Sequence, residues 1–280
     1  MMNKMNKKVV RSHTLKPQDK TILHFRYRMH MDYEIPVEKY FFTIKAIPCR
    51  NARQTVLDLS MHLQPPFLYS DNRDAFGNQL IYGSARQSHR SFSYEIRGRV
   101  EIGQILYEEV ARGEEAYLYR HPHGLNRAGN ELKGYYDSIA GQLEENSYVN
   151  AIYLMRCLHR DFVYAADVTR VDTDAEAAWR IGRGVCQDYA HIFIALCHMA
   201  GIAARYVVGI MQGEGESHAW VEILYRGKWI GMDPTNDQLV ARSHIKFGHG
   251  RDARDCQLNR GILYGGGAQL QEIKVSVSEE

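Results

Sequence analysis

Cys186, His218 and Asp233 are three residues whose types and order along the chain are typical of nucleophilic catalysis on a carbonyl group. In such sites a cysteine thiolate attacks the carbonyl carbon, a histidine accepts and returns a proton, and a carboxylate orients the imidazole ring. Chains of this length usually contain these residue types, so their spacing alone is weak evidence. The prediction therefore depends on the element that carries each residue.

Cys186 lies where a glycine-rich turn, Gly182-Arg-Gly-Val-Cys186, enters a predicted helix. A thiol at a helix N-terminus faces unpaired backbone N–H groups and the positive end of the helix dipole, which favours the thiolate. A free cysteine has a pKa near 8.5, and such a position beside a cationic histidine lowers it to roughly 3.5–7.5. The alternative role is that of a buried structural cysteine. We expect that role for Cys157 and Cys197, because both lie within apolar helical runs.

A predicted β-hairpin carries the other two residues. If Arg226-Gly227 is its two-residue loop, Trp220 lies opposite Asp233. His218 then shares a face with Trp220 and lies diagonal to Asp233, within reach of its side chain. A slip of one residue would place His218 and Asp233 on opposite faces. The site therefore depends on this turn.

The residues before the site predict a separate β-domain. Apolar and polar residues alternate strictly over 23–31, 57–63 and 91–97, which is the pattern of half-buried antiparallel strands. We therefore expect an antiparallel β-sandwich over residues 21–103. Residues 1–20 carry six Lys and Arg residues without a following apolar run, so we expect a flexible basic tail there.

The remainder of the chain predicts a mixed α and β core over residues 131–280, after a connecting segment at 104–130. A Thr-x-x-Glu capping box at Thr173–Glu176 opens one helix, and Gly201 ends the helix that begins at Cys186. The fold class is therefore α+β, with an N-terminal antiparallel β-sandwich before an α+β core. The predicted elements of the core are helices at 131–143, 147–162 and 186–200, a short helix through Ala177–Trp179 that Gly182 and Gly184 stop, and strands at 204–211, 217–225 and 228–233.

Composition excludes several classes of function. The 280 residues suffice for two domains, and 35 Lys plus Arg against 33 Asp plus Glu leave a net charge of +2. This balance predicts no nucleic-acid partner and no membrane partner. Five cysteines without a CxxC pair fit neither a disulfide framework nor a zinc ribbon, which indicates a reduced, cytoplasmic protein. No run of about 18 apolar residues could form a membrane span.

Three sequence blocks together resemble the transglutaminase-like cysteine-protease superfamily. Two further segments resemble its bacterial branch, in which a β-sandwich region precedes a papain-like catalytic core. The resemblance covers nearly everything after residue 20, although the segment at 255–261 lacks the proline expected in this branch. The three blocks are Gly182–His191, Ser217–Glu222 and Trp229–Asn236, and the two segments are Gly201–Tyr206 and His244–Asp252.

The resemblance implies a role for each candidate residue. Cys186 attacks an amide or ester carbonyl, His218 acts as base and then as acid, and Asp233 orients His218. The implied activity is that of a cysteine peptidase, which cleaves an amide or isopeptide bond of a peptide or protein substrate through an acyl-enzyme. Acyl transfer to an amine, as in transglutaminases, is the close alternative because it shares the acyl-enzyme. A non-catalytic binding module is the alternative from another class.

Neither a cofactor nor a metal is expected. The calcium sites of animal transglutaminases are not carried over, because no cluster of acidic residues lies near the motifs. The pattern G-x-G-x-x-A at Gly248–Ala253 lacks the crossover helix of a dinucleotide site. His191 and His198 beside Cys197 are expected on a packed or solvated helix face, since no metal-ligand spacing supports them. The second oxyanion donor is open between Gln187, Trp179 and other groups.

Overall fold

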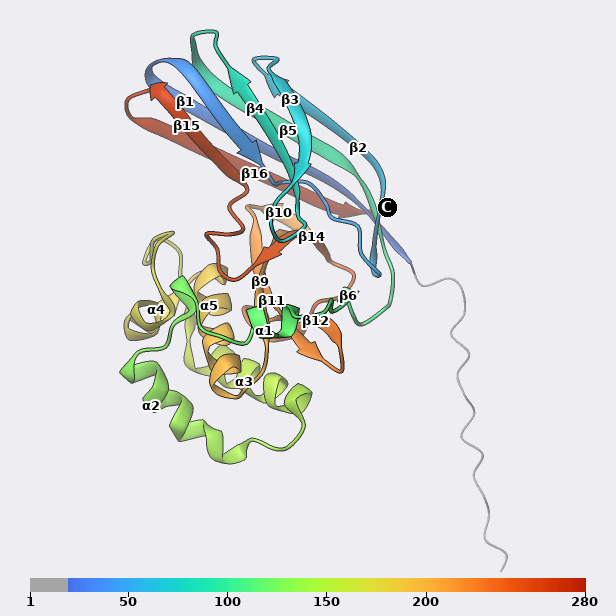
Figure 1. Ribbon diagram of the computed structural model, residues 1–280, viewed down its shortest axis with the longest axis vertical. Coiled ribbons are helices and arrows are strands. Elements are labelled where there is room, and N and C mark those ends of the chain that lie inside the picture. The colour runs from blue at the N-terminus through green and yellow to red at the C-terminus, as the bar shows by residue number, and fades with distance from the viewer. Residues whose placement is uncertain (1–19) are drawn as a thin grey trace, which may run out of the picture.

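The computed structural model describes residues 20–280 and shows a curled β-domain above a compact core of helices and strands (Figure 1). The α+β class is confirmed. The tail expected at residues 1–20 lies outside the described residues except for Lys20. No helix in the described part is long and apolar enough to cross a membrane.

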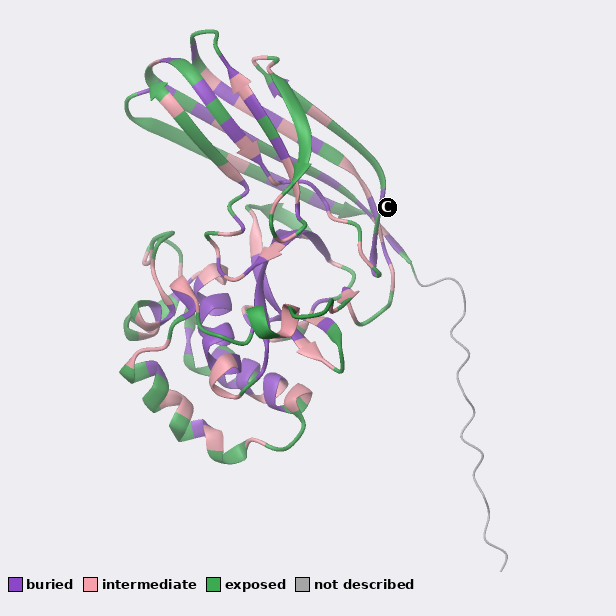
Figure 2. Cartoon of the chain, viewed as in Figure 1, coloured by how far each residue is buried: buried purple, intermediate pink, exposed green. Residues whose placement is uncertain are grey.

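The β-domain is organised around one long strand, β1 (Thr21–Ile44), whose buried and exposed residues alternate (Figure 2). The first half of β1 pairs with one set of neighbours and the second half with another, so the antiparallel sheet curls and its aromatic residues meet inside. Phe42 from the second half of β1 packs on Phe92 with ring centroids 4.9 Å apart. The other strands of this sheet are β2 (Gln54–Gln64), β3 (Leu68–Arg73), β4 (Gln79–Ala85), β5 (His89–Ile102), β10 (Gly213–Gly215), β15 (Asn259–Gly265) and β16 (Gln269–Glu279).

The last two strands differ from the expectation that residues 131–280 lie wholly in the core. β15 pairs with the second half of β1 and β16 with its first half, so both belong to the β-domain (Figure 1). The reason is that β4 and β5 cover only one edge of β1 and leave the other edge to be paired. An alternating pattern predicts a strand, but it carries no information about which sheet the strand joins.

The core consists of helices packed on a second antiparallel sheet, with strand order β13-β12-β11-β9-β14 and β6 on β12. Helix α5 (Cys186–Met199) packs against β9 and β11, and most of its residues are buried. The strands are β6 (Glu109–Val110), β9 (Ala204–Met211), β11 (His218–Tyr225), β12 (Lys228–Asp233), β13 (Gln238–Leu239) and β14 (His244–Gly250). A separate parallel pair joins β7 (Val163–Tyr164) to β8 (Arg183–Gly184). The remaining helices are α1 (Glu115–Leu118), α2 (Asn130–Ile139), α3 (Ser147–Asp161) and α4 (Ala175–Ile181), with short 3-10 turns at Gly124–Asn126 and Ala140–Gln142.

The predicted hairpin register is confirmed. Tyr225 pairs with Lys228, and the ladder continues to Val221 opposite Met232. The loop residues Arg226 and Gly227 both have positive φ, 49° and 73°. Two such residues in succession are the mark of a type I′ turn, whose twist matches that of the flanking strands.

The capping box predicted at Thr173–Glu176 is wrong in detail. Asp174 caps α4 by accepting a hydrogen bond from the Ala177 N–H at 2.8 Å. Glu176 instead accepts hydrogen bonds from three backbone N–H groups at the start of α2, including that of Gly129 at 2.8 Å. A carboxylate there complements the positive end of the α2 dipole and ties the two helices together.

Residues of the β-domain hold β14, an edge strand of the core sheet. Gln54 donates to the Lys246 carbonyl at 2.9 Å and accepts from the Lys246 N–H at 2.8 Å. The Cys49 N–H also donates to the Lys246 carbonyl, and Asn78 makes two bonds to the His249 backbone. The β-domain therefore completes the hydrogen bonding of a strand that lies close to the candidate site.

Candidate active site

The hairpin register brings His218 and Asp233 together. His218 is the first residue of β11 and Asp233 the last of β12. The Nε2 atom of His218 lies 2.9 Å from Oδ2 of Asp233, with the His218 side chain 12% exposed and that of Asp233 fully buried. Nδ1 is then the ring nitrogen of His218 that remains for another partner.

Cys186 is the first residue of α5, and its side chain lies close enough to His218 to help raise the pKa of that histidine. The Asp188 carboxylate fixes this helix start, because it accepts from the Val185 N–H at 2.8 Å and from the Thr169 hydroxyl at 2.7 Å. A Cβ on Gly184 would lie 2.3 Å from that carboxylate, so the turn requires glycine here. The structure thus brings together all three residues that the sequence singled out.

Electrostatics favour a charged histidine. Burial lowers the pKa of His218, but its interactions with Asp233 and Cys186 outweigh burial and raise the pKa to about 10. Burial would raise the pKa of Asp233, but the hydrogen bonds that it accepts hold this pKa well below its usual range. The site is therefore suited to hold an imidazolium between a carboxylate and a thiolate.

Two residues at the site were missed by the sequence analysis. His244 places Nε2 3.1 Å from Oδ2 of Asp233, and Asn236 donates its side-chain amide to the same oxygen at 2.7 Å. The backbone N–H groups of Thr235 and Asn236 donate to Oδ1. The turn Asp-Pro-Thr-Asn after β12 was a signal for the Asn236 contact, since Asp side chains commonly accept N–H groups two or three residues ahead. The contact of His244 depends on the packing of β14 and has no local signal.

Within residues 20–280, His218, Asp233 and His244 bring potential metal-binding atoms within 4.8 Å of one another. Both Nε2 atoms hydrogen-bond to Oδ2 of Asp233, so a cation would have to displace these protons. The residues form a complete hydrogen-bonded array without a metal, and the expected absence of a metal stays a prediction.

The other residues considered from the sequence have structural partners. His191 is fully buried, and burial lowers its pKa to about 4, so it stays neutral and accepts the Ala253 N–H. His198 bonds to the Tyr119 carbonyl. Trp179 packs on Tyr135 with ring centroids 4.2 Å apart. The amide of Gln187 donates to the Val171 carbonyl, and Gly248–Gly250 belong to antiparallel β14.

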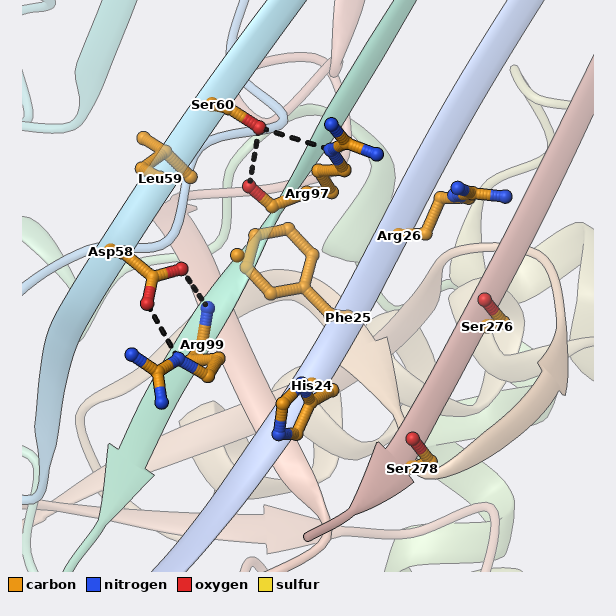
Figure 3. Close-up of a pocket in the computed structure, with 11 residues that line it drawn as sticks. His24, Phe25, Arg26, Asp58, Leu59, Ser60, Arg97, Arg99, Ser276 and Ser278 are labelled. Atoms are coloured by element: carbon orange, nitrogen blue, oxygen red, sulfur yellow. Dashed lines mark hydrogen bonds and ion pairs between the residues drawn. The ribbon is translucent and has the colours of Figure 1, made fainter.

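A pocket of about 440 Å³ lies on the outer face of the β-domain (Figure 3). Arg97 bonds to Ser60 there, and Arg99 pairs with Asp58 at 2.6 Å. No residue of the Cys186 site lines this pocket. The pocket and the candidate active site are therefore separate features.

The arrangement defines an α+β protein with a cysteine at a helix N-terminus and a His–Asp pair on an adjacent hairpin. Residues 133–234 match the model of the transglutaminase-like superfamily, and residues 23–101 match the bacterial transglutaminase-like N-terminal region. The chain belongs to this family, and the resemblance noted from its motifs is confirmed.

Similar proteins cover most of the chain. An uncharacterized protein of Mycobacterium tuberculosis is 37% identical over 254 residues, which span 78% of this chain and 79% of the relative. An uncharacterized protein of Mycobacterium leprae is 34% identical over 269 residues, 88% of this chain and 94% of the relative. The crystal structure of a "Putative Cysteine Protease" from Cytophaga hutchinsonii has a TM-score of 0.78 at 20% identity, covering 94% of this chain and 91% of that one. This match confirms the fold, with a β-domain before a transglutaminase-like core.

Proposed function

We propose that this protein is a cysteine-dependent amide hydrolase that cleaves a peptide or isopeptide bond through an acyl-enzyme on Cys186. The observation that carries the proposal is the buried His218–Asp233 pair, with Nε2 2.9 Å from Oδ2, next to a thiol at the start of α5. A buried structural cysteine needs no such partners.

The reaction follows from the roles of these groups. The Cys186 thiolate attacks the amide carbon, and imidazolium His218 then gives its proton to the leaving amine as the C–N bond breaks. Neutral His218 next takes a proton from water, whose oxygen attacks the thioester; the C–S bond breaks, the acid leaves, and the thiolate of Cys186 and the imidazolium of His218 are restored. Asp233 orients the ring and stabilises its charged form. Cys186 is the first residue of the helix, so its backbone N–H is free of intrahelical bonding and suited to the oxyanion.

Alkylation and cleavage test the proposal together. Iodoacetamide is expected to modify Cys186 rapidly, and a peptide library is expected to be cleaved by the native chain but not by Cys186→Ala. Cys49→Ala is a matched control that should keep both properties, because burial raises the pKa of Cys49 to about 12. An unmodified Cys186 with no cleavage, or activity that survives Cys186→Ala, would leave a non-catalytic binding module as the better reading.

Acyl transfer to an amine is the second candidate, since the same acyl-enzyme can react with an amine in place of water. The match to the transglutaminase-like superfamily favours keeping this candidate. A labelled primary amine offered with a glutamine-containing protein distinguishes the two reactions. Incorporation of label that exceeds hydrolysis would assign the transferase reaction.

We infer that the protein works in a reducing compartment, the cytoplasm. All five cysteines are free thiols, and the proposed nucleophile needs its thiol reduced. Cell fractionation tests this inference, and recovery of the protein in an oxidising compartment would contradict it.

A further inference from the structure

We propose that His244 is a positioning residue that shares one carboxylate oxygen of Asp233 with His218 and thereby keeps His218 able to release its proton. The inference rests on the proposed function. His218 and His244 both direct Nε2 at Oδ2 of Asp233, at 2.9 Å and 3.1 Å. The Asn236 amide donates to the same oxygen, and the two imidazole donors compete for the negative charge that remains.

An ionised Asp233 carboxylate only accepts hydrogen bonds, so the hydrogen of neutral His244 lies on Nε2, and this tautomer is supported by Ser243. Its hydroxyl lies 3.1 Å from Nδ1 of His244 and can donate to that nitrogen. The hydrogen of the neutral ring is then on Nε2, where it donates to Asp233. Burial lowers the pKa of His244, so the ring is a neutral donor at ordinary pH. His244 therefore withdraws charge from Asp233 without adding a positive charge to the site.

Packing prevents His244 from turning away. The His244 ring meets Trp220 edge-on with centroids 5.3 Å apart, and Trp220 in turn lies 6.1 Å from His218. Gly209 makes room for this indole, since a Cβ there would lie 2.5 Å from the Trp220 ring. The bonds from Gln54 to Lys246 hold β14 in register. The β-domain thus has a definite role, which is to fix the strand that carries His244.

The charged groups around the two imidazole rings come from separate parts of the chain. Asp233 faces both rings from β12, and Cys186 faces His218 from the start of α5. The positive charges of His218 and of Arg53, which precedes β2, also lower the pKa of His244. Arg53 is itself paired with Glu108 at 2.6 Å. The two cations disfavour protonation of His244 and help to keep it a neutral donor.

Removal of the His244 donor leaves His218 with a larger share of the Asp233 charge. The imidazolium then holds its proton more firmly, so it survives to higher pH, but the proton passes less readily to a leaving amine. In His244→Leu we expect the alkaline limb of the Cys186 alkylation profile, where His218 loses its proton, to move up by about 0.5–1 pH unit, the size of one ordinary hydrogen bond. We expect kcat to fall by about 10-fold with KM unchanged.

The experiment measures iodoacetamide alkylation of Cys186 against pH in the full chain, followed by kcat and KM on a cleaved peptide. His244→Gln keeps a side-chain amide donor, so the limb of its alkylation profile should lie at the same pH as in the native chain. Ser243→Ala removes the hydroxyl that supports this tautomer and should shift the limb in the same direction as His244→Leu, by less. His62→Leu is the matched control at an exposed strand position and should change nothing.

Each outcome decides the inference. A limb that stays in place or moves downward in folded His244→Leu overturns it, as does an equal shift in His244→Gln. If His244→Leu does not fold, Ser243→Ala decides alone, and an unchanged limb overturns the inference. Alkylation requires no substrate, so the profile remains measurable if no peptide is cleaved. Failure of the native thiol to react with iodoacetamide would instead count against the proposed function.

Discussion

Glu222 and Lys246 meet inside the core on the sheet face that carries the candidate site, with Nζ of Lys246 2.7 Å and 2.9 Å from the two carboxylate oxygens. Glu222 follows His218 by four residues on β11, and Lys246 follows His244 by two on β14. Both positions therefore share a face with their respective histidines. Arg205 donates a third bond to Glu222 at 2.7 Å. The two histidines of the site and these two residues of the ion cluster are thus carried by the same two strands.

Glu222→Gln should destabilise the protein strongly. The substitution leaves the buried cations Arg205 and Lys246 with one anion fewer, and breaking such a cluster costs about 3–5 kcal/mol. Urea unfolding of the native chain and the variant measures the loss. Glu272→Gln is the matched control on an exposed ion pair and should change the free energy of unfolding by less than about 0.5 kcal/mol. Equal effects of the two substitutions would contradict the role assigned to the cluster.

Asp233→Asn should lower kcat on the order of 10³-fold, because the amide neither stabilises the imidazolium nor enforces the ring orientation.

The same substitution should also change how the free energy of unfolding depends on pH. A group whose pKa is raised on folding, from 6.5 to about 10 for His218, stabilises the fold fully below pH 6.5 and loses this contribution as pH rises toward 10. Native stability should therefore decline across this range more steeply than that of Asp233→Asn. Urea unfolding at pH 6 and pH 10 checks the difference, and parallel declines would show that Asp233 does not set the pKa of His218.

The turn that sets the register can be tested separately from catalysis. Arg226→Asn should stabilise the protein by up to about 1 kcal/mol, because Asn-Gly is the preferred pair for the positive φ angles found here. Gly227→Ala should destabilise it by about 1 kcal/mol, since alanine resists a φ of 73°. Thermal unfolding and Cys186 alkylation are the measurements. Alkylation should be unchanged in both variants, and a large loss in Arg226→Asn would indicate that the turn is not type I′.

Local chemistry explains what the sequence predicted. The Gly182–Val185 turn specifies a helix start at Cys186, and Arg226-Gly227 specifies a register, so the contact between His218 and Asp233 followed from two short segments. The contact of His244 with Asp233 did not follow, because it needs β14 to pair with β9 and to be held by the β-domain. Pairing across long separations depends on which edges the other strands leave free, and a single sequence does not record this.

The C-terminal strands β15 and β16 should be essential to the stability of the β-domain, although in the sequence most of the core lies between them and β1. Val277 on β16 is 4% exposed, and its Cβ faces the same interior as the aromatic residues of β1. Val277→Ala should lower the free energy of unfolding by about 2 kcal/mol. Leu270→Ala on the same strand should have little effect, because Leu270 is 71% exposed. Urea unfolding compares the two variants.

β16 also pairs with β10, which directly precedes the segment leading to His218, so local unfolding of β16 should loosen this segment as well. Slower alkylation of Cys186 in Val277→Ala at moderate urea, with no change in Leu270→Ala, would establish that link, and equal rates would exclude it.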